Sequence, residues 1–177
     1  MSIFAALEKS LYMKALKEFD IHFGGLKLGN HDYSFFLSKP FFDAFDYQEY
    51  EKFDLEVLLR LEKESRVLNF HFTIEGTVEV PCDVSNELFD LPISAEAILV
   101  VRFGDHFDDE DGELVILPNG ERNYNVSKFL FDTVVLSIPA KKVHPDLEKA
   151  NNTTAESPEE PESLIDPRWN KLKNLLN

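Results

Sequence analysis

Apolar and polar residues alternate with a period of two along much of the chain between residues 19 and 103. This period places successive side chains on opposite faces of a β-strand, so it predicts strands that are buried on one face. The clearest alternation covers residues 53–61, and a second covers residues 68–74. The loop Lys63-Glu64-Ser65 lies between them, which predicts that the two strands pair antiparallel.

The stretch from residue 66 to residue 93 is predicted to organise the fold. It is expected to contain two strands joined by a tight link at Glu75-Gly76, followed by a turn around Cys82. Pro81 cannot donate a backbone hydrogen bond, so it should end the second of these strands. Together with residues 53–61, the two strands would form an antiparallel meander with one face in solvent.

Further elements follow from the same reasoning. The run Ile98-Leu99-Val100-Val101 predicts a strand that is buried on both faces. Asn123 is a candidate N-cap for a helix over residues 124–136, which would cover the sheet. The other predicted elements are a short helical segment at 41–45 and strands at 19–23, 33–37, 93–103 and 114–117. The predicted fold class is therefore α+β and mainly β: an antiparallel meander sheet or partly closed barrel covered by one long helix, with a short C-terminal helix.

Composition divides the chain into four parts. Residues 1–12 are interpreted as an N-terminal extension and residues 13–145 as the β-rich domain. Residues 146–163 are rich in acids and poor in apolar side chains, which is typical of a flexible acidic linker. Residues 164–177 are predicted to form a terminal helix, with Asp166 as its cap and Pro167 at its first position.

The charge of the chain narrows the classes of partner. Net charge is −15, from 33 acidic and 18 basic residues, so the mean field repels nucleic acid phosphates and attracts basic partners. Sixteen phenylalanines predict an aromatic-rich core. A single cysteine excludes an internal disulfide and fits a reducing compartment. No apolar run approaches 18 residues, and the expectation is a soluble cytoplasmic protein.

No motif predicts a catalytic, cofactor or metal site. In the acidic loop at 105–112, aligning Gly112 with the glycine of a calcium loop puts Phe107 and Pro118 where carboxylates are required. Cys82 has Ser85 three residues on, and no histidine pair stands at zinc-ligand spacing. Nucleophile signatures are absent as well, so the protein is expected not to be an enzyme.

Trp169 is the residue of the terminal segment most suited to an apolar contact. It shares one predicted helix face with Leu172 and Leu176. That face could pack on the chain's own domain or dock in the groove of a partner, and the residues leave both alternatives open.

Three motifs resemble the YceD family, whose bacterial and plastid members are associated with accumulation of large-subunit ribosomal RNA. They are Gly76-Thr77-Val78-Glu79-Val80-Pro81 leading into Cys82-Asp83, then Leu88-Phe89-Asp90-Leu91-Pro92-Ile93, and the ending Asp166-Pro167-Arg168-Trp169. The opening over residues 17–27 is similar to the version found in Bacteroidetes, so the likeness spans about 13–177. Many members carry Cys-x-x-Cys where this chain has Cys82 and Ser85, so a metal or redox role of that pair does not carry over.

The resemblance implies a ribosome biogenesis factor that supports 23S rRNA accumulation and large-subunit assembly. With the acidic charge, it favours binding of a basic large-subunit ribosomal protein or a pre-ribosomal particle. In the family the gene often lies beside that of a small, basic, zinc-binding protein of the large subunit. The candidate partner-binding residues are Cys82, Asp83, Asp166, Pro167, Arg168 and Trp169. The alternatives are a module that binds RNA directly and a hydrolase that uses Cys82 or the loop at 105–111.

Overall fold

The structure, a computed structural model, describes residues 16–109 and 112–147. The chain divides into two compact units, Met1–Lys142 and Val143–Asn177, and every strand and helix named below belongs to the first. The predicted extension at 1–12, most of the predicted linker at 146–163 and the predicted terminal helix lie outside the described residues.

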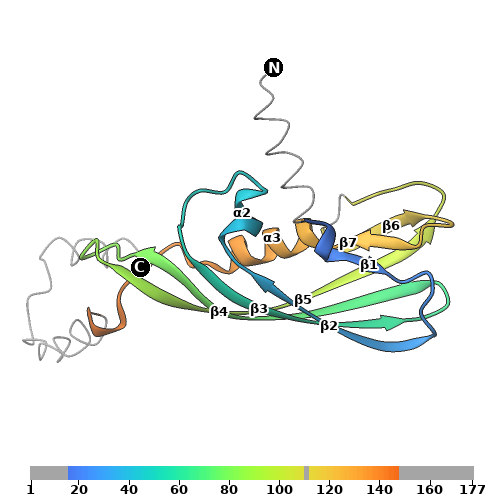
Figure 1. The fold of residues 1–177 in the computed structure, drawn as a ribbon, viewed down its shortest axis with the longest axis horizontal. Helices are drawn as coiled ribbons and strands as arrows, with labels where there is room; N and C mark the ends of the chain where they lie inside the picture. The colour runs from blue at the N-terminus through green and yellow to red at the C-terminus, as the bar shows by residue number, and fades with distance from the viewer. Residues whose placement is uncertain (1–15, 110–111, 148–177) are drawn as a thin grey trace, which may run out of the picture. The chain divides into compact units, whose positions relative to one another are not determined.

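A five-stranded sheet in the order β2-β3-β4-β5-β6 forms the centre of the first unit (Figure 1). Strands β2 to β5 pair antiparallel in sequence order, and β6 pairs parallel to β5. Two further short strands, β1 and β7, pair with each other, and three short helices complete the unit. The bounds are η1 Lys17–Phe19, β1 Asp20–His22, β2 Gly29–Leu37, α2 Lys39–Asp43, β3 Phe53–Lys63, β4 Val67–Pro81, β5 Leu88–Gly104, β6 Leu114–Pro118, β7 Asn123–Asn125 and α3 Ser127–Ser137.

The predicted hairpin is confirmed, because β3 pairs with β4 across the short loop in antiparallel register, with Leu61 opposite Phe70. The predicted fold class is wrong in two respects. No long helix covers the sheet in the described part of the chain, where α3 has 11 residues and α2 has 5. The sheet is not closed either, since its order begins at β2 and ends at β6 without pairing between them.

The start of α3 explains the overestimated helix. Asn123 does not cap a helix, because Asn123–Asn125 instead pairs with Asp20–His22 as β7. Helix α3 begins four residues later than the candidate cap, and the side-chain oxygen of Asn125 accepts a hydrogen bond from the backbone N–H of Ser127 at 3.0 Å. The pairing with β1 is non-local, so the local sequence carries no sign of it.

Gly76 does not link two strands but lies inside the single 15-residue strand β4. It stands opposite Leu55 of β3 and has a φ of +147°. A Cβ at this position would lie 2.0 Å from the carbonyl oxygen of Asp54. The glycine is therefore required because a neighbouring strand approaches its backbone closely, and not because the chain turns there.

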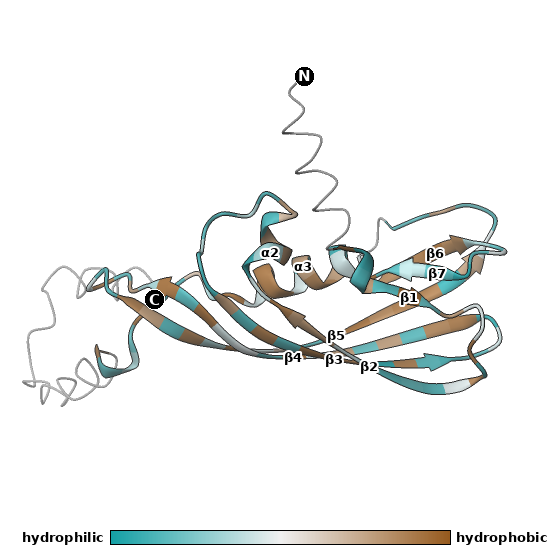
Figure 2. Ribbon diagram, in the orientation of Figure 1, coloured by the Kyte–Doolittle hydropathy of each residue, from teal (hydrophilic) through white to brown (hydrophobic). Residues whose placement is uncertain are grey.

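The core lies between the sheet and the short helices, which Figure 1 shows on one side of the sheet. Figure 2 shows hydrophobic and hydrophilic residues alternating along the strands. Aromatic rings fill much of the core, as predicted: Phe42 stacks on Phe53 with centroids 3.7 Å apart, and Phe72 contacts Phe129 of α3 at 5.2 Å. The hydrogen bonds of the long strands thus hold one apolar face against helices that are themselves too short to be stable alone.

The opposite face of the sheet is open, as the predicted meander with one wet face requires. The prediction that Ile98–Val101 is buried on both faces is wrong, because Leu99 and Val101 are fully buried while Ile98 is 53% exposed. The run is apolar on both sides of the strand, yet no described element covers the outer side (Figure 1). We call this solvent-facing side of β2–β5 the open face.

Candidate docking surface on the open sheet face

The turn around Cys82 is held by its own backbone. Cys82 accepts a hydrogen bond from the N–H of Asn86 at 2.8 Å and donates one to the carbonyl of Glu87 at 2.9 Å. Asn86 takes a positive φ of 59°, as a tight turn needs. The thiol of Cys82 is buried, with 2% of the residue exposed. This residue therefore fills the base of the turn and presents no accessible nucleophile.

Asp83 joins this turn to the segment that follows α3. Its backbone N–H donates to the carbonyl of Lys142 at 2.7 Å, and its carboxylate accepts from the backbone N–H of Lys142 at 2.7 Å. These two bonds clamp two segments 59 residues apart in the chain. The other predicted partner-binding residues, Asp166, Pro167, Arg168 and Trp169, lie outside the described residues.

No group of three or more histidine, cysteine or carboxylate side chains is placed to hold a metal ion within residues 16–109 and 112–147. Ser85, at the second position of the Cys-x-x-Cys pattern, is exposed, and its hydroxyl accepts a bond from the N–H of Glu87 at 3.4 Å. None of the described helices is long and apolar enough to cross a membrane. A binding role of the polar side chains therefore depends on how they are arranged on the surface.

Carboxylates dominate the open face. Cross-strand register shows which residues share it, because directly opposed residues point to the same side. The exposed acids that β2–β5 place there are Asp32, Asp54, Glu56, Glu62, Glu75, Asp90 and Glu96. The arginines of the same strands on this face are Arg60 and Arg102. Two of the carboxylates are paired, Asp32 with Arg60 at 3.0 Å and Asp90 with Lys52 at 3.3 Å.

Glu56 and Glu75 stand directly opposite each other across β3 and β4. Neither of them, nor Glu96 two residues beyond the partner of Glu75 on β5, is within ion-pair distance of a basic side chain in the described parts of the chain. Like charges directly opposite on a sheet are destabilising, by roughly 0.2–1 kcal/mol. A cationic partner would remove this repulsion on binding.

Large apolar side chains lie among these acids. Phe36 of β2 is 60% exposed and stands opposite Glu56, while Leu58 of β3 is 53% exposed and stands opposite Thr73. Ile98 adds a third apolar side chain on β5. A surface that mixes carboxylates with exposed aliphatic and aromatic groups suits a partner that is both basic and partly apolar.

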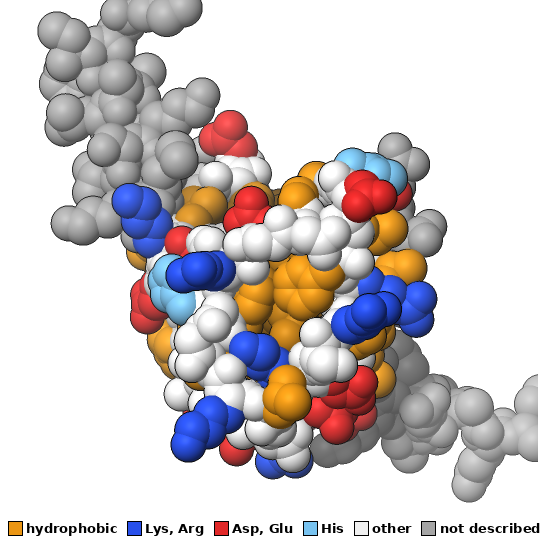
Figure 3. Space-filling model, turned by 90° about the vertical axis from the view of Figure 1, so that its right-hand side faces the viewer, with side chains coloured by type: hydrophobic (Ala, Val, Ile, Leu, Met, Phe, Trp, Pro, Cys, Tyr) orange, Lys and Arg blue, Asp and Glu red, His pale blue; other side chains and the backbone are white. Residues whose placement is uncertain are grey.

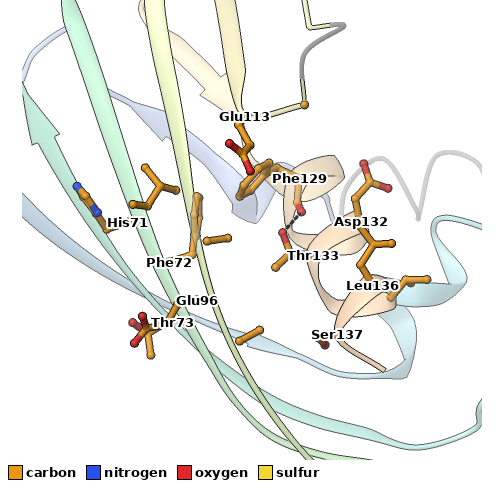
Figure 4. A pocket seen from close by; sticks show the side chains of 15 residues that line it. His71, Phe72, Thr73, Glu96, Glu113, Phe129, Asp132, Thr133, Leu136 and Ser137 are labelled. Atoms are coloured by element: carbon orange, nitrogen blue, oxygen red, sulfur yellow. Dashed lines mark hydrogen bonds between the residues drawn. The ribbon is translucent and has the colours of Figure 1, made fainter. Parts of the chain in front are cut away.

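A groove of about 1090 Å³ lies where β5 faces α3. Ala95 and Ala97 point to the inner side of β5, and their short side chains leave space beneath the helix. Figure 4 shows Phe72 and Phe129 pointing toward each other at this place, while His71 points to the other side of the sheet. The charged residues of the lining are Glu96, Glu113 and Asp132, with no lysine or arginine.

The charges at one end of the molecule are mixed in sign. Figure 3 shows acidic and basic side chains interspersed around a hydrophobic hollow, without an area of basic side chains alone. This face does not offer the one-signed basic patch that RNA phosphates would require.

Four tyrosines in the described parts of the chain have pKa values displaced upward by their surroundings, and burial is the cause for Tyr33. Burial, and then the charge of Asp109, raises the pKa of Tyr124 to about 12. Burial, and then a hydrogen bond to Glu49, raises the pKa of Tyr50 to about 12, and the same two causes raise that of Tyr47 further. All four phenols stay protonated at neutral pH, so these shifts concern stability and do not create a general base.

The groove between β5 and α3 is not predictable from the sequence alone. Its position depends on where α3 rests on the sheet, which is a tertiary feature. One local feature of the sequence does indicate it. Positions 93, 95, 97 and 99 share the inner face of β5, and alanine occupies the two middle positions between Ile93 and Leu99. Two small residues in an otherwise large-residue row indicate a gap or a close approach.

The comparisons with known proteins add one match. A family model described as "Large ribosomal RNA subunit accumulation protein YceD" matches residues 70–176, more than half of the chain. The matched region begins in β4 and includes β5, β6, β7 and α3. Neither the curated proteins nor the solved structures give a significant match.

Proposed function

Because the chain belongs to the YceD family of large ribosomal RNA subunit accumulation proteins, we propose that it is a binding factor in large-subunit biogenesis that holds a basic ribosomal protein. The family places the protein in the accumulation of large-subunit ribosomal RNA. The proposed mechanism is charge complementarity: the open face binds the basic protein, keeps it soluble and delivers it to its ribosomal RNA or assembly particle.

The observation that carries this proposal is the pair of opposed carboxylates, Glu56 and Glu75, between exposed apolar side chains. Ribosomal proteins that neutralise RNA phosphates are rich in lysine and arginine, and such side chains would pair with these acids. A net charge of −15 also steers a basic protein toward the surface and repels RNA. Contact with RNA is therefore proposed to be indirect.

We propose further that the protein acts without catalysis. The form of the hydrolase alternative that uses Cys82 needs an accessible, activated thiol, yet this residue is only 2% exposed. Asp83, beside it, is engaged in the clamp with Lys142, and a neighbouring carboxylate would disfavour the thiolate. Replacing Cys82→Ser should leave partner binding intact with a modest loss of stability, whereas loss of function in a stable protein would support the hydrolase.

A charge-neutralising double variant, Glu56→Gln with Glu75→Gln, tests the proposal. Binding of purified large-subunit ribosomal proteins would be measured at low salt for the wild type and for this variant. The control is Glu64→Gln with Glu121→Gln, which removes the same charge from two exposed residues outside the sheet strands.

The double variant should bind at least about tenfold more weakly than the control, and wild-type binding should weaken as salt screens the charges. Equal affinity of the two variants would refute the role of the open face. If the protein bound ribosomal RNA more tightly than any ribosomal protein, the direct RNA-binding alternative would replace the proposal.

A further inference from the structure

One edge of β5 is left without a strand partner over most of its length. β5 pairs with β4 over Leu88–Arg102 on one side, whereas on the other side β6 pairs only with Val100–Gly104. Residues 88–99 therefore have a free edge among the described strands. A free strand edge presents backbone donors and acceptors that can pair with another chain.

The direction of the free groups follows from one hydrogen bond. The N–H of Val100 donates to the carbonyl of Glu113, on the β6 side, at 2.8 Å. Backbone groups alternate along a strand, so Ile98, Glu96 and Ser94 direct their N–H and C=O to that same side. Pro92 is the next residue in this series, and a residue without an N–H is tolerated at such an unpaired position.

The groove lies beside this edge. Ala95 and Ala97 line it from the inner face of β5, and Phe129 and Leu136 line it from α3. Leu136 is 85% exposed, so its side chain is available for contact. A strand placed about 4.8 Å from β5 would direct alternate side chains into this apolar groove and the others toward the open face, near Glu96.

We propose that an extended basic segment of the partner protein adds to the free edge of β5 as a further strand, with its apolar side chains in the groove. This inference rests on the proposed function and gives it a geometry. The backbone N–H and C=O groups of Ser94, Glu96 and Ile98 would pair with the added strand. They continue along the same edge of β5 on which β6 begins to pair at Val100.

Charge selects the occupant. The charged lining residues are Glu96, Glu113 and Asp132, which favour lysine and arginine on the added strand. A second copy of the chain would bring the same carboxylates and a net charge of −15 to the contact, so it would be repelled. The acidic residues 146–163 of the chain itself would be repelled for the same reason.

The test uses the full chain and a labelled eight-residue peptide in which lysine and valine alternate. The matched control peptide has the same sequence, with an N-methyl group on every backbone amide, so that neither edge can pair in either strand direction. It carries the same charge but cannot donate hydrogen bonds to β5. Fluorescence anisotropy at low salt would give the two affinities, and the account expects the methylated peptide to bind at least about tenfold more weakly.

Two protein variants locate the contact. Ile98→Pro removes an N–H that faces the groove and none that the β4 ladder uses, whereas Ile98→Ala removes the side chain and keeps the N–H. The peptide should bind Ile98→Pro at least about tenfold more weakly than Ile98→Ala. Equal affinities of the two peptides for the wild type, or of the two variants for the peptide, would overturn strand addition in favour of simple charge attraction.

If Ile98→Pro does not fold, hydrogen exchange of the wild-type backbone amides can test strand addition instead. In the wild type, the amides of Ser94, Glu96 and Ile98 should exchange fast without peptide and slowly with it, while those of Ala95 and Ala97 stay protected throughout. Slow exchange of the first set without peptide would mean that the chain or a second copy already occupies the edge, and would overturn the proposal. Failure of the peptide to bind at all would also overturn strand addition. The proposed binding of ribosomal proteins to the open face would not be affected by that result, because the Glu56→Gln, Glu75→Gln double variant tests it separately.

Discussion

Gly76→Ala should destabilise the protein more than a typical surface substitution, because two separate costs meet at this residue. Its φ of +147° is a conformation that residues with a Cβ rarely adopt, which costs about 1–3 kcal/mol. The new Cβ would also lie 2.0 Å from the carbonyl oxygen of Asp54 and 2.8 Å from the Cα of Leu55. Both neighbours are backbone atoms of β3, so relief requires the paired strands to move apart.

The expected loss is therefore about 3 kcal/mol or more, out of a total stability that is typically about 5–15 kcal/mol. For a protein of this size, 3 kcal/mol corresponds to a decrease in Tm of roughly 6–12 °C. Urea unfolding followed by circular dichroism measures the free energy, provided that the slope m is unchanged.

Gly25→Ala is the matched control, because it makes the same chemical change where a Cβ meets no atom within 4 Å and φ is not positive. Its effect should stay within about 0.5 kcal/mol of zero. If Gly76→Ala lost less than about 1 kcal/mol, the close approach of β3 to β4 at this residue would be wrong.

Three further predictions concern the sheet, the helix and the tyrosines. Glu75→Gln should stabilise the protein by roughly 0.2–1 kcal/mol in urea unfolding at low salt by ending the repulsion from Glu56, and a loss of stability would contradict that repulsion. Leu99→Ala should lower the free energy of unfolding by about 2–5 kcal/mol because the side chain is fully buried. Leu136→Ala, at an 85% exposed residue, should change it by less than about 0.5 kcal/mol. Similar losses for the two variants would refute the described packing. Because burial raises the pKa of Tyr124 from 10.0 to about 12, the stability it contributes is complete below pH 10 and is lost as pH rises through about 12. Tyr124→Phe should reduce this alkaline loss in pH-dependent melting, and an unchanged alkaline transition would show that Tyr124 ionises equally in both states.

The strands could be predicted where the local pattern is also the tertiary one. Leu55, Val57 and Leu59 alternate with charged or exposed residues, and their burial on one face follows directly. Gly76 misled because glycine marks both turns and close backbone approaches, and only the position of Asp54 distinguishes these cases. Ile98 misled because an apolar side chain on a strand need not be covered.

The acidic character of the candidate docking surface was predictable from the sequence, but its position on the fold was not. Net charge indicated a basic partner, and it cannot indicate which face of the molecule carries the acids. The opposition of Glu56 and Glu75 depends on the register of β3 and β4, and the free edge of β5 depends on how far along β5 the pairing with β6 begins. Cys82, which stands out as the only cysteine, proves to be a buried residue of a turn.

The most direct measurement is a pull-down of the tagged full chain from its native organism, with and without nuclease, with the captured proteins identified by mass spectrometry. Basic large-subunit ribosomal proteins should be captured, should persist after nuclease treatment and should decrease in the Glu56→Gln, Glu75→Gln double variant. Loss of every ribosomal protein on nuclease treatment would show that RNA forms the bridge, and would contradict the proposal that the acidic open face binds the protein directly.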